Sequence, residues 1–154
     1  MSISLALHVI AAVVWVGGLF FAYTALRPSA ASVLEPPQRL ALWRAVFDRF
    51  FRWVWVAVVV LLVTGYGMVF GFYGGMGAVG VHVHVMQATG IAMMLLFLHV
   101  WFAPYRRLGR ALDAGDVPAA AGELDRIRRI VRINVALGLI TIAAGSGGRF
   151  LALG

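Results

Sequence analysis

The sequence predicts an all-α, polytopic membrane protein folded as an up-down bundle of four transmembrane helices. One observation is its composition, which is 62% hydrophobic and only 12% charged, whereas soluble domains carry about 25% charged residues. The other is a set of four nearly uncharged stretches, each long enough for the roughly 20 residues that cross a bilayer. They lie near residues 3–26, 53–72, 81–103 and 133–153. Because no soluble segment of useful size remains, residues 1–154 are expected to form a single membrane domain.

The arginines predict the topology of these four spans. All 13 basic residues are arginine; five lie between Arg27 and Arg52 and seven between Arg106 and Arg132. These two segments connect the first span to the second and the third to the fourth. The N-terminus and the 73–80 connection carry no charge. Since basic residues beside spans favour the cytoplasmic side, both termini are expected outside, and the basic charge does not indicate nucleic-acid binding.

The segments beside the spans predict two further helices. The first span has no basic residue before it, so it is expected to be a retained helix rather than a cleaved signal peptide, and to end near Pro28. Residues 37–50 alternate apolar and charged faces at helical spacing, which predicts an interfacial helix running into the second span. Residues 117–132, with Asp116 as N-cap, predict a second interfacial helix that continues into the fourth span.

Four histidines lie in this apolar chain: His8, His82, His84 and His99. A polar side chain inside a membrane is costly and usually functional. At about 1.5 Å per residue, His8 lies about 8 Å below the outer end of the first span, level with His82 and His84, and His99 lies about 22 Å deeper. Residues two apart on a helix point to nearly opposite sides, and we expect His84 rather than His82 to face the bundle.

The leading hypothesis from these residues is a b-type haem with His8 and His84 as axial ligands. Arg149, near the outer end of the fourth span, would pair with a propionate or, equally, lie at the membrane interface. The other residues expected around the macrocycle come from the first two spans: Trp15, Gly17, Gly18, Thr64 and Tyr66. A second haem is not expected, because His99 is the only histidine at the inner level. His99 would bind another group or pair with Asn134.

Two alternatives remain open at this point. Copper, especially Cu(I), suits imidazole and thioether ligands. The outer histidines could therefore bind it together with nearby methionines, although thioethers also serve simply to fill gaps between helices. The candidate ligands of this kind are His8, His82, His84, Met68, Met76 and Met86. In the second alternative the histidines hydrogen-bond neighbouring helices, and the protein is a cofactor-free scaffold or subunit.

The spans also exclude several chemistries. They contain no carboxylate, and the chain contains no cysteine. Paired acid–base catalysis and thiolate metal sites therefore have no residues to support them. An enzyme with this sequence would be a membrane oxidoreductase. The partners that remain open, besides the lipid bilayer, are a redox partner, a quinone and a second copy of the chain.

Four stretches carry a resemblance to a known family. They are "LHVIAAVVWVGGLFFAYTALRP" at 7–28, "TGYGM" at 64–68, "HVMQATGIAMMLLFLHVWFAPYRRL" at 84–108 and "IRRIVRINVALGLITI" at 127–142. They resemble the CopD (copper resistance D) family of bacterial integral membrane proteins, in particular its short, uncharacterised relatives. The resemblance implies a four-helix core in the bacterial inner membrane and, for copper resistance D itself, movement of copper across that membrane.

A more distant similarity is to the HemJ-type membrane protoporphyrinogen oxidase, which also begins with a histidine-bearing helix. That similarity implies haem bound through the histidine matched here by His8. The oxidase also relies on a lysine, and this sequence has none. The sequence as a whole therefore predicts a haem b-binding membrane protein with a redox or haem-handling role, with copper binding or transport as the alternative.

Overall fold

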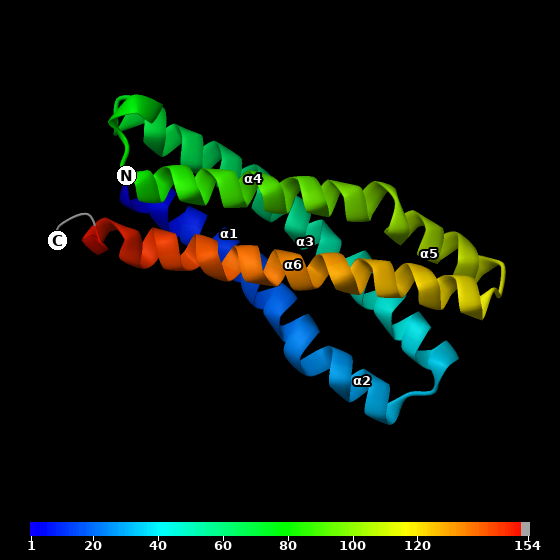
Figure 1. Cartoon of the computed structure of the whole chain (residues 1–154). Helices are drawn as coiled ribbons and strands as arrows, with labels where there is room; N and C mark the ends of the chain where they lie inside the picture. The colour runs from blue at the N-terminus through cyan, green and yellow to red at the C-terminus, as the bar shows by residue number, and fades with distance from the viewer. Residues whose placement is uncertain (152–154) are drawn as a thin grey trace.

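A computed structural model of the chain describes residues 1–151 and the side chains of residues 1–148. It confirms the predicted all-α class. Four helical segments are long and apolar enough to cross a membrane: Ser2–Val33, Pro36–Gly71, Val81–Asp113 and Val117–Gly148. The start of α1 and the last described turn of α6 lie at one end of the bundle with the 72–80 connection, and we call this end the histidine end (Figure 1). The two other turns lie at the opposite, arginine-rich end. The side of the membrane that each end faces stays a prediction.

The first segment consists of α1 (Ser2–Phe21), a π-helical stretch (Ala22–Leu26) and α2 (Arg27–Val33). The expectation that this helix ends near Pro28 is wrong. Pro28 lies in the first turn of α2, directly after the π-helical stretch. In the π-helical stretch the backbone N–H of Arg27 donates to the carbonyl oxygen of Ala22, five residues earlier, and this wider turn accommodates a proline that a regular α-helix interior would not. The chain therefore continues in helical form to Val33.

The second and fourth segments are single long helices, α3 (Pro36–Gly71) and α6 (Val117–Leu151). The amphipathic residues 37–50 are the first part of α3, and residues 117–132 the first part of α6, which continues into the fourth span as predicted. The backbone N–H of Ala119 donates to Oδ1 of Asp116 at 3.0 Å, so Asp116 caps α6 as predicted. At about 1.5 Å per residue, both helices exceed the hydrocarbon thickness and extend the bundle beyond it.

The third segment contains a break that the sequence analysis did not predict. Helix α4 (Val81–Phe102) ends at Ala103, whose φ of −116° and ψ of −88° interrupt the helix. The chain then resumes as α5 (Pro104–Asp113), which buries Pro104 and Leu108 against α6. A short 3₁₀ turn (Met76–Ala78) lies in the connection between α3 and α4.

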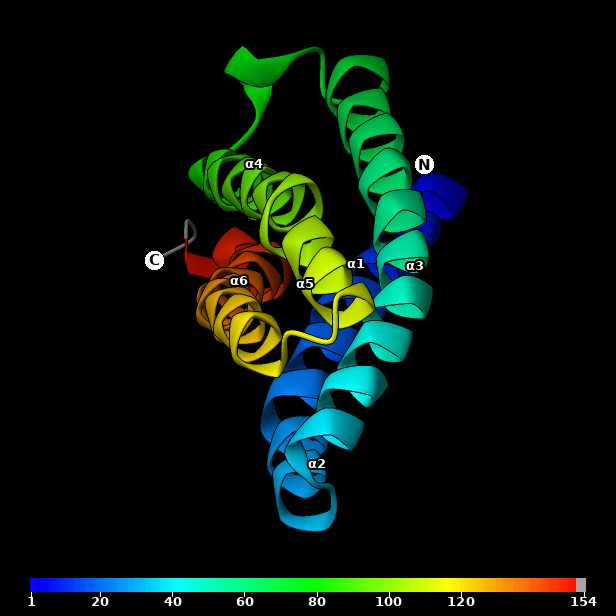
Figure 2. The same ribbon diagram turned by 90° about the vertical axis from the view of Figure 1, so that its right-hand side faces the viewer.

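The bundle consists of two antiparallel pairs that cross each other. Helix α1 packs mainly on α3, and α4 mainly on α6; Figure 2 shows the α1/α3 pair on one side and the α4/α6 pair on the other. Aromatic side chains join the pairs. The ring of Phe97 in α4 lies 5.5 Å from that of Phe51, 5.3 Å from that of Trp55 and 6.2 Å from that of Trp15. The rings of Phe97, Phe51 and Trp15 are buried in the core of the bundle, and the partly buried Trp55 packs against them.

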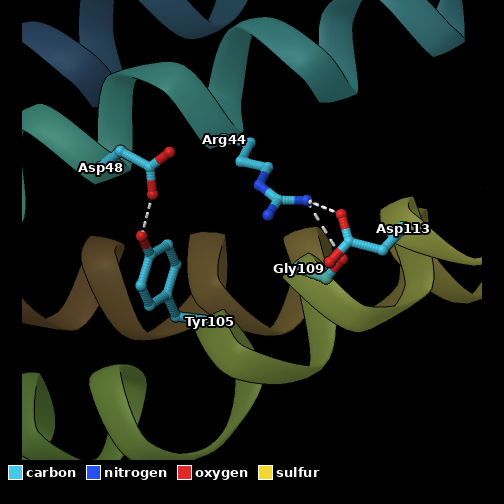
Figure 3. Close-up of polar contacts among 5 residues, drawn as sticks. All are labelled: Arg44, Asp48, Tyr105, Gly109 and Asp113. Carbon is cyan, nitrogen blue, oxygen red and sulfur yellow. Dashed lines mark hydrogen bonds and ion pairs between the residues drawn. The ribbon is translucent and has the colours of Figure 1, made fainter.

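At the arginine-rich end, polar contacts attach α5 to α3 (Figure 3). Nη1 of Arg44 donates to Oδ1 of Asp113 at 2.6 Å and to the carbonyl oxygen of Gly109 at 3.2 Å. One turn along α3, Asp48 accepts a hydrogen bond from the hydroxyl of Tyr105. Because the Arg44 and Asp113 side chains are 37% and 66% exposed, this ion pair contributes at most about 1 kcal/mol.

Candidate functional site

His8 is half-buried in α1 and faces α3. Its Nδ1 lies 2.8 Å from Oγ1 of Thr64, and the same Oγ1 lies 2.6 Å from the carbonyl oxygen of Val60. A carbonyl can only accept, so the single hydroxyl proton of Thr64 is directed to Val60. His8 must then donate from Nδ1 to Thr64. This arrangement leaves Nε2 with a free lone pair, the form of histidine that binds metals.

The residues predicted to surround a haem lie in different places. Thr64 meets His8, as expected, but Tyr66 accepts a hydrogen bond from Nε2 of Gln87 at 2.9 Å, a partner that the sequence analysis missed. Trp15 is 2% exposed and belongs to the aromatic core. The room left by Gly18 is filled by the ring of Phe50, which a Cβ there would overlap.

His82 and His84 lie on different faces of α4, and the predicted choice between them is wrong. His84 is exposed, whereas His82 is partly buried against α6. A Cβ added at Gly148 of α6 would overlap the Cβ of His82. Because α6 has no side chain at Gly148, α4 can approach it closely with His82 on the facing side. His82 is therefore the histidine of this pair that lies on the α6-facing side of α4.

Met86 lies one turn below His82 on the same face of α4. A Cβ added at Gly145 of α6 would lie 3.2 Å from the sulfur of Met86 and 3.1 Å from its terminal methyl carbon. Side chains four residues apart on a helix are neighbours, with Cβ atoms about 5–6 Å apart. His82 and Met86 thus occupy successive turns of the α4 face that meets the two glycines of α6, with the imidazole ring of His82 turned back toward Gly80, where an added Cβ would lie 2.9 Å from its Nδ1.

The same contact surface continues toward the middle of the bundle. The hydroxyl oxygens of Thr89 and Thr141 lie 2.6 Å apart, and Oγ1 of Thr141 lies 4.0 Å from the sulfur of Met93. Nδ2 of Asn134 donates to the carbonyl oxygen of Met93 at 3.4 Å, and its buried Oδ1 has no partner among the described residues. We call this surface the α4–α6 seam. Its members are His82, Met86, Thr89 and Met93 of α4 and Asn134, Gly138, Thr141, Gly145 and Gly148 of α6.

The seam carries a sequence signal that the sequence analysis missed. Its residues on α4 are spaced by four, three and four positions, and those on α6 by four, three, four and three. This spacing is typical of a stripe along one side of a helix. The polar and small residues of the third and fourth spans therefore lie on two facing stripes.

The histidines do not form one cluster. Among the described residues, no three histidine, aspartate or glutamate side chains gather closely enough to hold a metal ion. His8 belongs to the α1/α3 pair and His82 to the α4/α6 pair. Because His84 points away from the bundle, the described residues do not provide the interior slot for a haem that the sequence predicts between His8 and His84.

The remaining predicted residues lie elsewhere. His99 is exposed at the arginine-rich end and lines a cleft with Arg107 and Arg129. The predicted pairing of His99 with Asn134 is not seen, because Asn134 is buried and bonds to Met93 instead. The side chain of Arg149 lies outside the described residues.

Comparison with known proteins identifies the family. The family model described as CopD, copper resistance protein D, matches residues 44–147, which is more than half of the chain. No curated protein and no solved structure matched the chain. The match includes most of α3, all of α4 and α5, and the part of α6 that forms most of the seam. The chain therefore belongs to the CopD family of membrane proteins, as the resemblance in its sequence predicts.

Proposed function

We propose that this protein binds copper ions at the histidine end of the α4–α6 seam and passes them along the seam. The family description, copper resistance, supports copper as the metal. The observation that carries the proposal is the position of His82 and Met86, four residues apart, on the face of α4 that meets Gly148 and Gly145. Copper is a substrate in this proposal and not a resident cofactor.

The chemistry of the pair favours Cu(I). Thioether sulfur and imidazole nitrogen are the soft and intermediate ligands that this ion prefers. Their spacing of four residues places both side chains on the same side of α4, and a turn of the His82 ring away from Gly80 would bring both donors to one ion. The two opposing glycines leave the ligands without a competing side chain from α6. An ion held by His82 and Met86 would therefore lie within the helix pair, away from lipid.

The rest of the seam supports movement of the ion toward the middle of the bundle. Met93 offers a second thioether, eleven residues from His82 and thus about 16 Å along the helix axis. Between them lie the hydroxyls of Thr89 and Thr141. Beside Met93, the Oδ1 of Asn134, which has no partner among the described residues, adds a buried acceptor. The seam thus offers donor groups at successive levels through an otherwise apolar bundle.

The test is a titration of the purified protein in detergent with Cu(I), in competition with a chromogenic Cu(I) chelator. We expect His82→Ala and Met86→Leu each to weaken binding at least tenfold. His84→Ala and Met94→Leu are the matched controls, because they remove the same groups from the same helix outside the seam. Both controls should bind as the parent does.

Three outcomes would overturn the proposal. The protein could fail to bind Cu(I), the seam variants could bind as tightly as the parent, or His84→Ala could weaken binding as much as His82→Ala. An absorption spectrum of the protein as purified provides an independent check. A Soret band that disappears in His8→Ala would favour the haem hypothesis instead.

A further inference from the structure

A second site lies at the arginine-rich end, far from the histidine end of the seam. A cleft of about 300 Å³ opens there between three helices. Helix α4 contributes His99, α5 contributes Pro104 and Arg107, and α6 contributes Arg126, Arg129 and Ile130. Three guanidinium groups and an imidazole therefore surround one cleft whose remaining lining is apolar.

The charge of the cleft is only partly balanced within the chain. Arg126 forms an ion pair with Glu123, with Nη1 and Oε1 3.0 Å apart. Within residues 1–148, no carboxylate forms an ion pair with Arg107 or Arg129. Like charges held near each other repel, and the attraction of both to a bound anion offsets that repulsion. The cleft is therefore complementary to an anion with several oxygen acceptors, which arginine binds in fork geometry.

The surroundings of the cleft indicate an amphiphilic anion. One turn from His99 toward the histidine end, Leu95 is 61% exposed on α4, and one turn from Arg129, Ile133 is 48% exposed on α6. Both belong to apolar spans, where exposed aliphatic side chains contact acyl chains. The cleft thus lies where the apolar outer surface of the bundle gives way to its arginines, at the expected level of lipid headgroups.

We propose that this cleft binds the phosphate headgroup of an anionic phospholipid, with Arg107 and Arg129 on the phosphate and the acyl chains along Leu95 and Ile133. Basic pockets between transmembrane helices are known to recognise such headgroups. The bound lipid would connect α5 to α6 from outside, on a different side of α5 from its contacts with Arg44. A zwitterionic lipid would lack the net charge that the two arginines require.

The test measures lipid retention by native mass spectrometry of the purified full chain. The protein is mixed with detergent micelles containing phosphatidylglycerol or phosphatidylcholine, and separately with inorganic phosphate. We expect clear preference for phosphatidylglycerol. The variant Arg107→Gln/Arg129→Gln should bind it about 25-fold more weakly, since each basic side chain near the membrane surface is worth about a factor of five.

The control is Arg110→Gln/Arg132→Gln, which removes the same charge from the same two helices outside the cleft and should bind phosphatidylglycerol nearly as the parent does. Equal losses in the two double variants would overturn the proposal, because only net charge would then matter. Equal retention of both lipids would also overturn it. Release of the lipid by millimolar inorganic phosphate would assign the cleft to free phosphate instead. Helical circular dichroism and Cu(I) binding should stay unchanged in all variants.

Discussion

Gly138 of α6 is the point where α1, α4 and α6 meet, and its replacement by alanine tests the packing of the whole bundle. A Cβ at this position would lie 2.8 and 2.9 Å from the two γ-carbons of Val16, and 3.3 Å from the terminal methyl carbon of Met93. The methionine end is flexible and can move aside. Val16 is β-branched and helical, so its side chain has essentially one rotamer. Val16, which is 5% exposed, must therefore be displaced together with α1.

The magnitude follows from two opposing effects. Forcing an extra methyl into a packed core costs about 1–3 kcal/mol, and alanine gains about 1 kcal/mol over glycine in helix propensity. We expect Gly138→Ala to lower the free energy of unfolding by about 1 kcal/mol. Val16→Ala in the same chain removes the overlap, so the double variant should show a favourable coupling free energy of about 2 kcal/mol relative to the sum of the single changes.

The assay is unfolding in mixed detergent and sodium dodecyl sulfate micelles, followed by circular dichroism. Gly17→Ala is the control, because a Cβ there meets nothing within 4 Å and should leave stability unchanged or slightly higher. If Gly138→Ala stabilises the protein as much as Gly17→Ala, or if the coupling with Val16→Ala is near zero, α1 does not pack on α6 at this position.

Three further predictions concern the polar groups and the topology. Thr64→Val leaves Nδ1 of His8 without its acceptor and should lower the free energy of unfolding by about 1 kcal/mol. Adding His8→Ala to this variant should not lower the free energy of unfolding further, and a large additional decrease would contradict the pairing. Asn134→Leu removes a buried oxygen with no described partner and should stabilise the protein by up to about 1 kcal/mol in the same unfolding assay, whereas a clear loss would show that Oδ1 is paired. In intact cells, a membrane-impermeant maleimide should label the single cysteine of Ala78→Cys but not that of Ala114→Cys, and the reverse would overturn the topology predicted from the arginines.

The sequence was informative where one residue or one run of residues decides the structure. Asp116 could be recognised as an N-cap because capping depends on neighbouring backbone N–H groups. Thr64 was expected near His8 only as one of the residues around a haem, since counting residues along each helix places both in the outer halves of their spans. Pro28 was misjudged because its effect depends on the π-helical stretch before it, which composition does not reveal.

The choice between His82 and His84 shows where sequence reasoning fails in this protein. In a soluble helix, polar residues mark the outer face, so the inner face can be read from periodicity. In α4 both the lipid-facing and the core-facing sides are mainly apolar, so apolar periodicity does not separate them, and the available signal is the spacing of the polar and thioether residues of the seam, a stripe that includes His82 and not His84. The small residues of α6 decide instead, because close helix approach in a membrane depends on van der Waals packing against such residues. Because Gly148 and Gly145 have no side chains, His82 and Met86 can lie on the side of α4 that faces α6.

The amino-acid sequence alone determined the membrane class, the number and approximate limits of the spans, and the expected placement of the arginines at one end. The spans follow from the free energy of transferring each segment from water into the bilayer, which depends on the composition of that segment alone. The expected side of the arginines follows from their positions beside the spans. Only the tertiary structure decided which histidine lies on the α6-facing side of α4, that His8 and His82 belong to different helix pairs, and that His99 shares a cleft with arginines. Those outcomes depend on which surfaces of separate helices fit together, and no single segment contains that information.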